Sequence, residues 1–493
     1  MASIVITEQD LTAIGSDLVG QGYVFIPGYA NTNADRYILD GTDTPLAESL
    51  NLDTTIRYAS NIDLQKSWTV SAGLWTEDAT YKHPKPENTI VLCRTIDEFE
   101  EAFGESPYIM AANQAYPATF SANAKPANIN FYNTGDFERS YVYAKELLFR
   151  GIPVAYYNVA IRNSENTDKK KGAKQDFSIE DFYSHLNSEV FDVETNTGIL
   201  DKGTYRIDFI TSGAYPVFEY NNNVITNKML SIAKTRGDCV ALIDHTDNEN
   251  RKLTGDTSVY QAIQTWAPTD GGLEYSAMYT PWSNGNVQSV SKANDDTITQ
   301  TIYPGSMAYL LAYAQSIKTN AEWLAVSGTT RGIVPINSLR STYILSNTIA
   351  NTVYQAKQGK RINPITNISG YGLCIFGNST LKDNGTSTTF ELTAQSFMNI
   401  RLLVCQVKKK LYEECLGLLF EQNNDILWAK FLSKITPLLD RMKTGSGISN
   451  YRVIKNATKE KAKLSATVRL IPIYALEDID INIELTNEDA AVQ

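Results

Sequence analysis

Both ends of the chain carry β-type runs that lack an obvious partner. Near the C-terminus, four apolar residues (Ile479, Ile481, Ile483 and Leu485) alternate with polar ones. That is the two-residue period of an amphipathic strand. A second β-type run, Ile4-Val5-Ile6, lies near the N-terminus. Because a lone amphipathic strand is not stable in water, each run must join a sheet, either in its own chain or in another copy.

Two helical patterns and two strands precede the terminal strand. Apolar residues recur at three- and four-residue steps over 397–419 and again over 426–442, and Asn424 is a candidate N-cap between them. Pro437 lies inside the second pattern, where it should kink the helix or split it in two. Residues 451–454 and 466–471 read as strands. Apolar stripes of this kind are typical of core packing.

Strand patterns alternate with helix patterns in the middle of the chain, which is typical of an α/β core. The predicted strands are 88–93, 152–161, 204–211, 239–244, 274–278 and 370–376, and the predicted helices are 97–103, 140–150, 303–316 and 341–357. Residues 30–88 are polar and irregular, with Trp68 and Trp75 in runs that fit strands. Residues 162–176 read as a charged loop and 177–202 as a small appended element.

These patterns predict a multidomain α+β protein with a mixed α/β core, a C-terminal helix-pair-plus-β domain, β-rich peripheral inserts and extended terminal strand arms. The predicted parts are an N-terminal arm and linker strand (1–27), a β-rich peripheral insert (28–83), the core (84–161 and 205–393), a charged loop with a small insert (162–204), the C-terminal domain (394–475) and a C-terminal arm strand (476–493). A length of 493 residues suits such a division.

Charge is distributed unevenly along the chain. The formal net charge is −11, yet residues 395–463 hold thirteen Lys or Arg against six Asp or Glu. The first 35 residues and residues 477–493 contain acidic side chains and no Lys or Arg. This asymmetry could drive self-association, although solvated faces are the simpler interpretation. The overall acidity argues against a bulk nucleic-acid binder.

Few residues suit disulfides, metal binding or acid–base chemistry. The five cysteines are widely spaced without a CxxC pair, and there are three histidines, which argues against a disulfide framework or a structural zinc site and favours a reducing cytoplasm. No apolar run reaches the ~18 residues of a membrane helix, and the first residues do not resemble a secretory signal.

No sequence pattern demands a catalytic centre. The sequence has no GxxxxGK[ST], GxSxG or HExxH motif. A metal cluster could be drawn from Asp238, Asp244, His245 and Asp247, but no second histidine supports it. Arg236-Gly237-Asp238 spells the integrin tripeptide directly before an apolar strand, which indicates coincidence. We therefore expect no enzyme activity, no cofactor and no metal.

Eight segments form an ordered set: 84–104 (PKPENTIVLCRTIDEFEEAFG), 136–160 (DFERSYVYAKELLFRGIPVAYYNVA), 236–244 (RGDCVALID), 275–282 (YSAMYTPW), 303–308 (YPGSMA), 322–332 (EWLAVSGTTRG), 361–381 (RINPITNISGYGLCIFGNSTL) and 397–453. In this order the set resembles the tail sheath proteins of contractile phages and related injection systems. Phe376 and Ser379 stand where that family usually has Trp and Arg. Residues 28–83 and 162–204 match nothing in the family.

The resemblance implies a structural subunit that polymerises as stacked hexameric rings around an inner tube. Contraction would then drive the tube through the target cell envelope. The implied partners are further copies of the chain, the inner tail tube protein, and the baseplate and tail terminator proteins, without direct nucleic-acid contact or stable membrane insertion. The implied location is a virion tail assembled in the host cytoplasm. A non-contractile, capsid-like lattice protein, or a cytosolic α/β enzyme using carboxylates such as Asp238 and Asp244, remain alternatives.

The resemblance also implies that both termini complete sheets in adjacent subunits, and it leads to three sets of site residues. The inter-subunit arms are Ile4, Val5, Ile6, Ile479, Ile481, Ile483 and Leu485. The predicted receiving sheet is Tyr451, Val453, Val468 and Leu470, which lie on the two strands of a hairpin. A basic helix facing the tube is predicted to present Arg401, Lys408 and Lys409.

Overall fold

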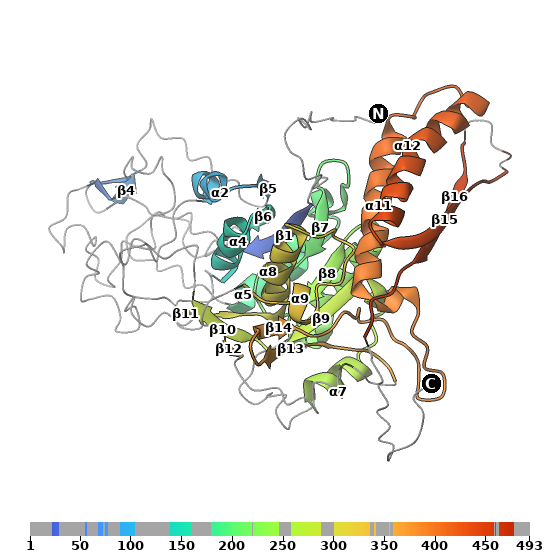
Figure 1. Ribbon diagram of the computed structural model, residues 1–493. Coiled ribbons are helices and arrows are strands. Elements are labelled where there is room, and N and C mark those ends of the chain that lie inside the picture. Colours follow the sequence, from blue (N-terminus) through green and yellow to red (C-terminus); the bar gives the residue numbers. More distant parts are fainter. Residues whose placement is uncertain are drawn as a thin grey trace, which may run out of the picture. The chain divides into compact units, whose positions relative to one another are not determined.

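The computed structural model describes residues 22–28, 55–56, 68–71, 74–76, 89–103, 139–159, 179–218, 220–245, 258–286, 300–335, 340–341, 354, 358–457, 459 and 463–477. The chain divides into two compact units, residues 1–413 and residues 414–493. Figure 1 traces the elements of both units.

A sheet of eight strands forms the centre of the first unit (Figure 1). From one edge to the other the strands are β14 (Gly372–Ile375), β13 (Asn363–Ile368), β9 (Ser276–Thr280), β8 (Val240–Ile243), β7 (Ile207–Ile210), β1 (Tyr23–Gly28), β6 (Val154–Asn158) and β5 (Ile90–Cys93). The inner strands run parallel, whereas β14 and β5 run antiparallel to their neighbours. Parallel strands are covered on both faces, which explains uninterrupted apolar runs such as Val240–Ile243.

Helices cover both faces of this sheet, so the unit has three layers. One face packs α2 (Ile96–Phe103), α4 (Arg139–Phe149) and α8 (Gly305–Ile317), and the other packs α5 (Ile179–His185), α6 (Val224–Arg236) and α7 (Ser258–Thr265). Successive residues of β1 alternate between the layers: Val24 and Ile26 belong to the first core and Tyr23 and Phe25 to the second. The predicted α/β core is present with these elements.

Short strands make up the remaining sheets of the first unit. β2 (Thr55–Ile56), β3 (Trp68–Ser71) and β4 (Leu74–Thr76) form one antiparallel sheet, and β11 (Gln300–Tyr303), β10 (Ser283–Asn286) and β12 (Arg340–Ser341) form another. Trp68 and Trp75 lie on β3 and β4, as predicted. The short helix α9 (Gly328–Arg331) follows α8.

The expectation that 177–202 forms an appended element is wrong. Helix α5 continues into a π-helical turn (Leu186–Val190) and then a 3₁₀ turn (Thr197–Leu200). The fully buried side chains of this stretch, Phe182, Leu186, Val190 and Ile199, belong to the second core cluster with α6. The region is therefore part of the core, because its apolar residues complete one layer over the sheet.

The C-terminal unit contains α12 (Asp425–Thr444) and a hairpin of β15 (Ile448–Lys455) and β16 (Ala466–Pro472). The preceding helix α11 (Met398–Leu416) crosses the boundary between the units. Residues 398–413 of this helix belong to the first unit, and Met398, Leu402 and Cys405 lie in that unit's core. The compact C-terminal unit thus begins at 414 and not at the predicted 394.

Helix α12 agrees with the predicted cap but not with a break at Pro437. The Asn424 side chain accepts a hydrogen bond from the Leu427 backbone N–H at 3.0 Å. The helix continues through Pro437 to Thr444, so the alternative of two helices is wrong. Pro437 is exposed and lies two residues from the buried Ile435 and Leu439, which is about 200° around the helix. The ring therefore faces solvent while the apolar stripe stays packed.

Several predictions fall outside the described residues. These are the loop 162–176, almost all of the predicted helix 341–357, and the arm residues Ile4–Ile6 and 479–485. The described end of the predicted segment 1–27 forms β1 inside the core sheet. Within the described residues, no helix combines the length and apolar character needed to cross a membrane.

Candidate functional site

The C-terminal hairpin is the candidate site, because the predicted arms Ile4–Ile6 and 479–485 lie outside the described residues. Its strands pair antiparallel with Tyr451 opposite Leu470 and Val453 opposite Val468. The four predicted receiving residues therefore form two cross-strand pairs on one face of the hairpin. Their role in receiving another strand remains a prediction.

That face of the hairpin is turned toward α12. The Tyr451 hydroxyl donates to Asp440 Oδ1 at 2.7 Å, and Lys455 Nζ lies 3.2 Å from Asp425 Oδ1. Both acidic residues belong to α12, and Val453 lies between Tyr451 and Lys455 on the same face. A strand added beside the hairpin with apolar residues on this face would extend the layer that packs on α12.

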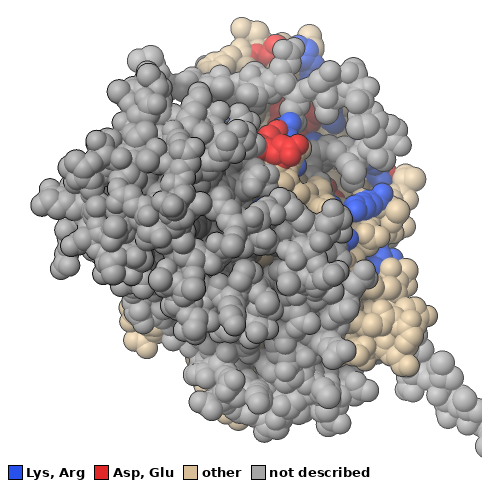
Figure 2. Space-filling view, turned by 90° about the vertical axis from the view of Figure 1, so that its left-hand side faces the viewer, with Lys and Arg blue, Asp and Glu red and all other residues tan. Residues whose placement is uncertain are grey.

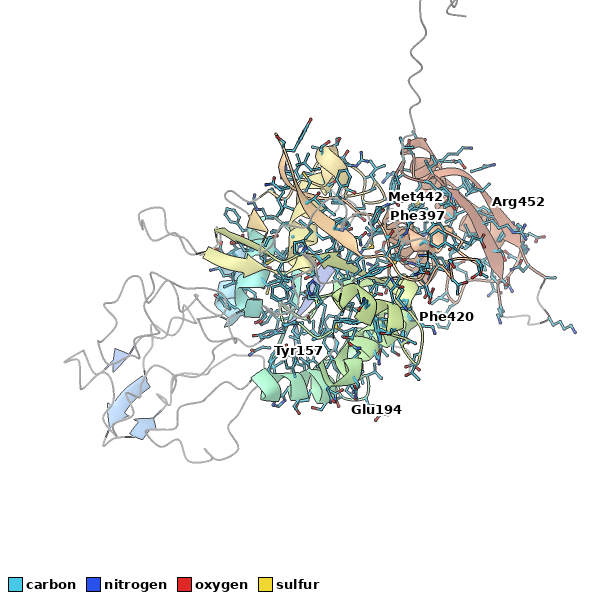
Figure 3. All side chains as sticks on the ribbon, turned by 90° about the horizontal axis from the view of Figure 1, so that it is seen from below. Tyr157, Glu194, Phe397, Phe420, Met442 and Arg452 are labelled. Carbon is cyan, nitrogen blue, oxygen red and sulfur yellow. The ribbon has the colours of Figure 1, made fainter. Side chains whose placement is uncertain are left out.

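The hairpin leaves backbone groups available for such a strand. Its sheet contains β15 and β16 alone, so among the described residues neither outer edge is paired with a third strand. Unpaired edges are templates for strand addition. Exposed apolar residues follow β16, with Leu476 78% exposed. Phe420, in the connection before α12, is 93% exposed and lies at the surface (Figure 3).

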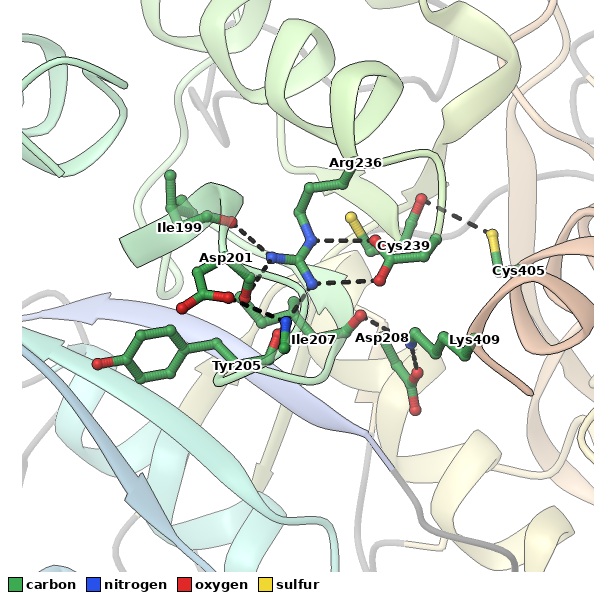
Figure 4. A network of polar contacts seen from close by, with 11 residues as sticks. Ile199, Asp201, Tyr205, Ile207, Asp208, Arg236, Cys239, Cys405 and Lys409 are labelled. Carbon is green, nitrogen blue, oxygen red and sulfur yellow. Dashed lines mark hydrogen bonds and ion pairs between the residues drawn. The ribbon is translucent and has the colours of Figure 1, made fainter. Parts of the chain in front are cut away.

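The predicted basic helix does not present all three of its residues. Lys408 is exposed, but Arg401 and Lys409 are only 4% and 5% exposed, so the assignment of these two to a tube-facing surface is wrong for the isolated chain. Lys409 Nζ donates to the Ile207 carbonyl at 2.7 Å and forms an ion pair with the buried Asp208 (Figure 4). The physical reason is that α11 packs against the core from Met398 to Lys409, so a basic side chain on the packed side meets acceptors inside the protein.

Arg401 is held by an aromatic ring. Its guanidinium carbon lies 4.0 Å from the centroid of the Tyr275 ring. Lys408 Nζ lies 5.3 Å from the same centroid and donates to the Tyr275 hydroxyl at 3.1 Å. The two ring contacts are cation–π interactions, which periodicity in the sequence of α11 does not reveal. Nearby, Lys410 pairs with Glu413 at 2.9 Å, as expected of a helical ion pair.

The carboxylates considered for catalysis or metal binding have structural partners. Asp238 accepts two hydrogen bonds from Arg236, at 3.0 and 3.2 Å. Arg236 also donates to the Ile199 and Tyr205 carbonyls, so the integrin-like tripeptide is buried and engaged. Asp247 lies outside the described residues. The described residues contain no group of three or more His, Cys, Asp or Glu that could hold a metal ion.

Asp244 joins two of the segments that carry the family resemblance. Its carboxylate, at the end of β8, accepts hydrogen bonds from the Ser306 backbone N–H at 3.0 Å and from the Ser306 hydroxyl at 2.5 Å. Complete burial raises the pKa of Asp244 to about 6, and the two bonds from Ser306 oppose that rise. Ser306 begins α8, so this contact fixes the start of the helix to the sheet.

Glycine is required beside this contact. A Cβ on Gly305 would lie 2.0 Å from the Tyr279 carbonyl oxygen, so no larger residue fits there. The sequence does contain a signal for this contact: Gly305-Ser306 follow the strand β11, and the acidic Asp244 follows the strand β8. Sequence reasoning assigned the segments but missed the contact, because the two lie about sixty residues apart.

Charged groups elsewhere are dispersed. On the face drawn in Figure 2, Lys and Arg of the described residues form separate groups with Asp and Glu among them. In the C-terminal unit Lys430 pairs with Glu421 and Lys434 with Glu414, at 3.1 and 2.8 Å. These pairs neutralise part of the excess of basic residues over 395–463.

Solved structures share this fold over nearly their whole length. A chain of an extracellular contractile injection system, the PVC sheath complex in the contracted state, matches with a TM-score of 0.53 and 13% identity, covering 98% of this chain and 97% of that chain. A chain of the contracted helical sheath of the anti-feeding prophage matches with a TM-score of 0.51 and 13% identity, covering 98% of both chains.

A chain of the anti-feeding prophage baseplate in the contracted state matches with a TM-score of 0.53 and 14% identity, covering 99% of this chain and 98% of that chain. No protein-family model matches the sequence, and no curated protein matches it. At this level of identity the comparison shows the fold. The chain therefore has the α/β architecture found in subunits of contractile injection assemblies.

Proposed function

We propose that this chain is the structural subunit of a contractile sheath. Copies would form stacked hexameric rings in a helical array around an inner tube, and contraction would drive that tube through a target cell envelope. The observation that carries this proposal is the fold match to sheath-complex chains, which spans 98% of this chain and 97% of the other. A match over a short common domain would carry far less weight, since one fold serves many functions.

Strand exchange between neighbouring copies would hold the array together. The hairpin of β15 and β16 has two outer edges without a partner strand among the described residues. The segments 3–7 and 479–485 have the strand-like composition that such an edge accepts. A strand added there would bond its backbone to the edge and bury its apolar row. The fall in free energy on contraction would come from new contacts between subunits.

The proposed partners are further copies of the chain, an inner tube protein, and baseplate and terminator proteins at the two ends of the array, in a virion-like tail. Lys408 is the one residue of the predicted basic helix left exposed, so any contact of that helix with the tube would use Lys408. The role is structural and needs no catalytic group. This agrees with the occupation of Asp238 and Asp244 by internal hydrogen bonds.

Removal of the C-terminal arm tests the proposal. Purified full-length protein should form hollow helical tubes or hexameric rings in negative-stain electron microscopy. The chain lacking 478–493 should remain folded, with an unchanged circular dichroism spectrum, and should sediment as a monomer. Compact particles from the full-length chain, at all concentrations and salts tested, would count against the sheath role. Normal tubes from the truncated chain would count against the arm assignment alone.

A further inference from the structure

Two arginines face each other across the C-terminal hairpin. Arg452 on β15 lies directly opposite Arg469 on β16 in the strand register, and both residues are exposed. Figure 3 marks Arg452 on the hairpin. No ion pair joins either guanidinium to an acidic residue among the described residues, whereas Lys430, Lys434 and Lys455 each have one. Like charges directly opposite on neighbouring strands destabilise a hairpin.

The arginine pair lies on the face that points away from α12. Tyr451 and Lys455 reach Asp440 and Asp425 of α12, so the odd-numbered residues of this part of β15 face the helix. Arg452 follows Tyr451 directly and therefore points to the opposite face. The hairpin thus has an apolar face on α12 and a face where two positive charges meet without an anion.

The C-terminal segment has the complementary pattern. Residues 478–493 contain five acidic side chains and no Lys or Arg. In the strand-like part, Ile479, Ile481, Ile483 and Leu485 share one face, and Asp480 and Glu484 share the other. A strand added to the hairpin with its apolar row toward α12 must place Asp480 and Glu484 on the arginine face, because side chains of adjacent strands align on common faces.

We propose that Arg452 and Arg469 form a carboxylate-binding site that sets the facing and register of the acidic C-terminal segment of a second copy of this chain. The inference rests on the proposed strand exchange and adds its specificity. The added strand lies beside either β15 or β16, and the arginine of that strand donates hydrogen bonds to the carboxylate of Asp480 or Glu484. The second arginine lies on the other strand of the hairpin, one strand further from the added segment. A shift by one residue would turn the apolar row to solvent and the carboxylates toward α12.

Charge reversal tests this site in the full-length chain. R452E/R469E keeps a like-charge pair across the hairpin, so its effect on folding should be small, but it places negative charge opposite the acidic segment. The critical concentration for tube formation should rise at least about tenfold. Adding D480R/E484R in the same chain should restore assembly to within about threefold of the wild type. The matched control K443E/K459E reverses two exposed lysines of the same unit and should assemble normally.

Normal assembly of R452E/R469E, or an equal loss in K443E/K459E, would overturn the site. A separate readout distinguishes specific recognition from a folding role. R469T removes the like-charge repulsion, so it should leave the thermal midpoint of the unassembled chain unchanged or slightly raised while weakening assembly. A lowered midpoint together with weakened assembly would indicate a role in hairpin stability and overturn the proposal.

A peptide experiment separates this inference from the sheath role itself. A labelled peptide of residues 477–493 should bind the full-length chain at low salt and bind R452E/R469E at least about tenfold more weakly. A peptide with Asp480 and Glu484 replaced by Asn and Gln should lose affinity for the wild-type chain. Arginine-dependent binding without tubes would refute the sheath and keep the site. Tube formation together with peptide binding that does not depend on these charges would support the sheath role and refute the arginine site.

Discussion

Single buried charges do structural work in the first unit. Asp208 is 4% exposed and accepts a hydrogen bond from the Gly22 backbone N–H at 2.6 Å, just before β1, while Lys409 of α11 pairs with the same carboxylate. A Cβ on Gly22 would lie 2.4 Å from the Asp208 carboxylate, so a larger residue there would have to displace that carboxylate. One carboxylate therefore contacts both the residue before β1 and the Lys409 side chain of α11.

Removing Lys409 should be much more costly than removing its neighbour. Lys409→Met leaves the buried Asp208 without its cation, and we expect a loss of about 3–5 kcal/mol in the free energy of unfolding. Lys408→Met, at an exposed position of the same helix, should stay within about 1 kcal/mol of the wild type. Urea denaturation of both variants measures the difference. Recovery of stability in the double variant D208N/K409M is expected, and its absence would contradict this account.

Asp244 should make stability depend on pH in an unusual direction. Its pKa in the folded chain is raised from 3.8 to about 6 by burial. A raised acid pKa means that the native state holds the proton more tightly, so the contribution of Asp244 is greatest below pH 4 and is lost as pH rises through about 6. An Asn side chain at position 244 is neutral, like the protonated Asp244, and can still form hydrogen bonds with Ser306. Asp244→Asn should therefore gain up to about 3 kcal/mol relative to wild type between pH 4 and pH 7.

Thermal unfolding of both proteins at several pH values between 4 and 7 measures this trend. Asp192→Asn is the control with the opposite sign. The hydrogen bond from Lys228 holds the pKa of Asp192 below its usual value of 3.8. The stabilisation by Asp192 is lost only as pH falls below that value, so Asp192→Asn should be less stable than wild type by a nearly constant amount between pH 4 and pH 7. A constant difference between Asp244→Asn and wild type across the range would show that Asp244 is not buried as a titrating acid.

At the scale of elements, α12 tolerates a proline because of where the residue falls. The buried residues of the helix, Leu427, Phe431, Ile435, Leu439 and Met442, recur every three or four positions, and Pro437 lies on the other side. The missing N–H at 437 removes one helical hydrogen bond at the solvent-facing side, where water can satisfy the freed carbonyl. The packing of the apolar stripe holds the helix together across this defect.

Replacing that proline should stabilise the helix. Pro437→Ala restores the backbone donor, and the gain of up to about 3 kcal/mol in helix propensity is offset by about 1 kcal/mol of unfolded-state entropy. We expect a net gain of about 1–2 kcal/mol in chemical denaturation. Ser433→Ala, on the same exposed face, should gain no more than about 0.5 kcal/mol. An equal gain in the free energy of unfolding from both variants would mean that Pro437 does not destabilise α12.

At the scale of the whole molecule, uneven charge should make assembly depend on salt. Residues 477–493 are acidic without a basic residue, while 395–463 carry a net positive charge. Attraction between such segments weakens as the Debye length falls from about 14 Å to about 4 Å between about 0.05 M and 0.5 M salt. We expect the critical concentration for tubes to rise over this range in sedimentation assays. Assembly that strengthens with salt would show that burial of apolar surface dominates instead.

The sequence determined many of the elements that form. Period-two and period-3.6 patterns predicted the core strands β5, β6, β7, β8, β9 and β14 and the helices α2, α4, α8, α11 and α12, because side-chain periodicity is a local property. Strand β13 and the helices α6 and α7 were not predicted. Asn424 identified the start of α12, and the strands around Tyr451 and Val468 were placed within a few residues of their observed bounds.

Only the tertiary structure decided which surfaces these elements bury. Lys409 looks like a solvent-facing lysine in sequence, but it is buried because an acidic residue some two hundred positions earlier lies opposite it. Residues 179–200 look like an insert, yet they complete a core layer. The facing of Arg452 and Arg469 follows from strand register, which depends on long-range pairing. Local patterns carry no record of such distant neighbours, because burial and charge pairing arise when the chain packs.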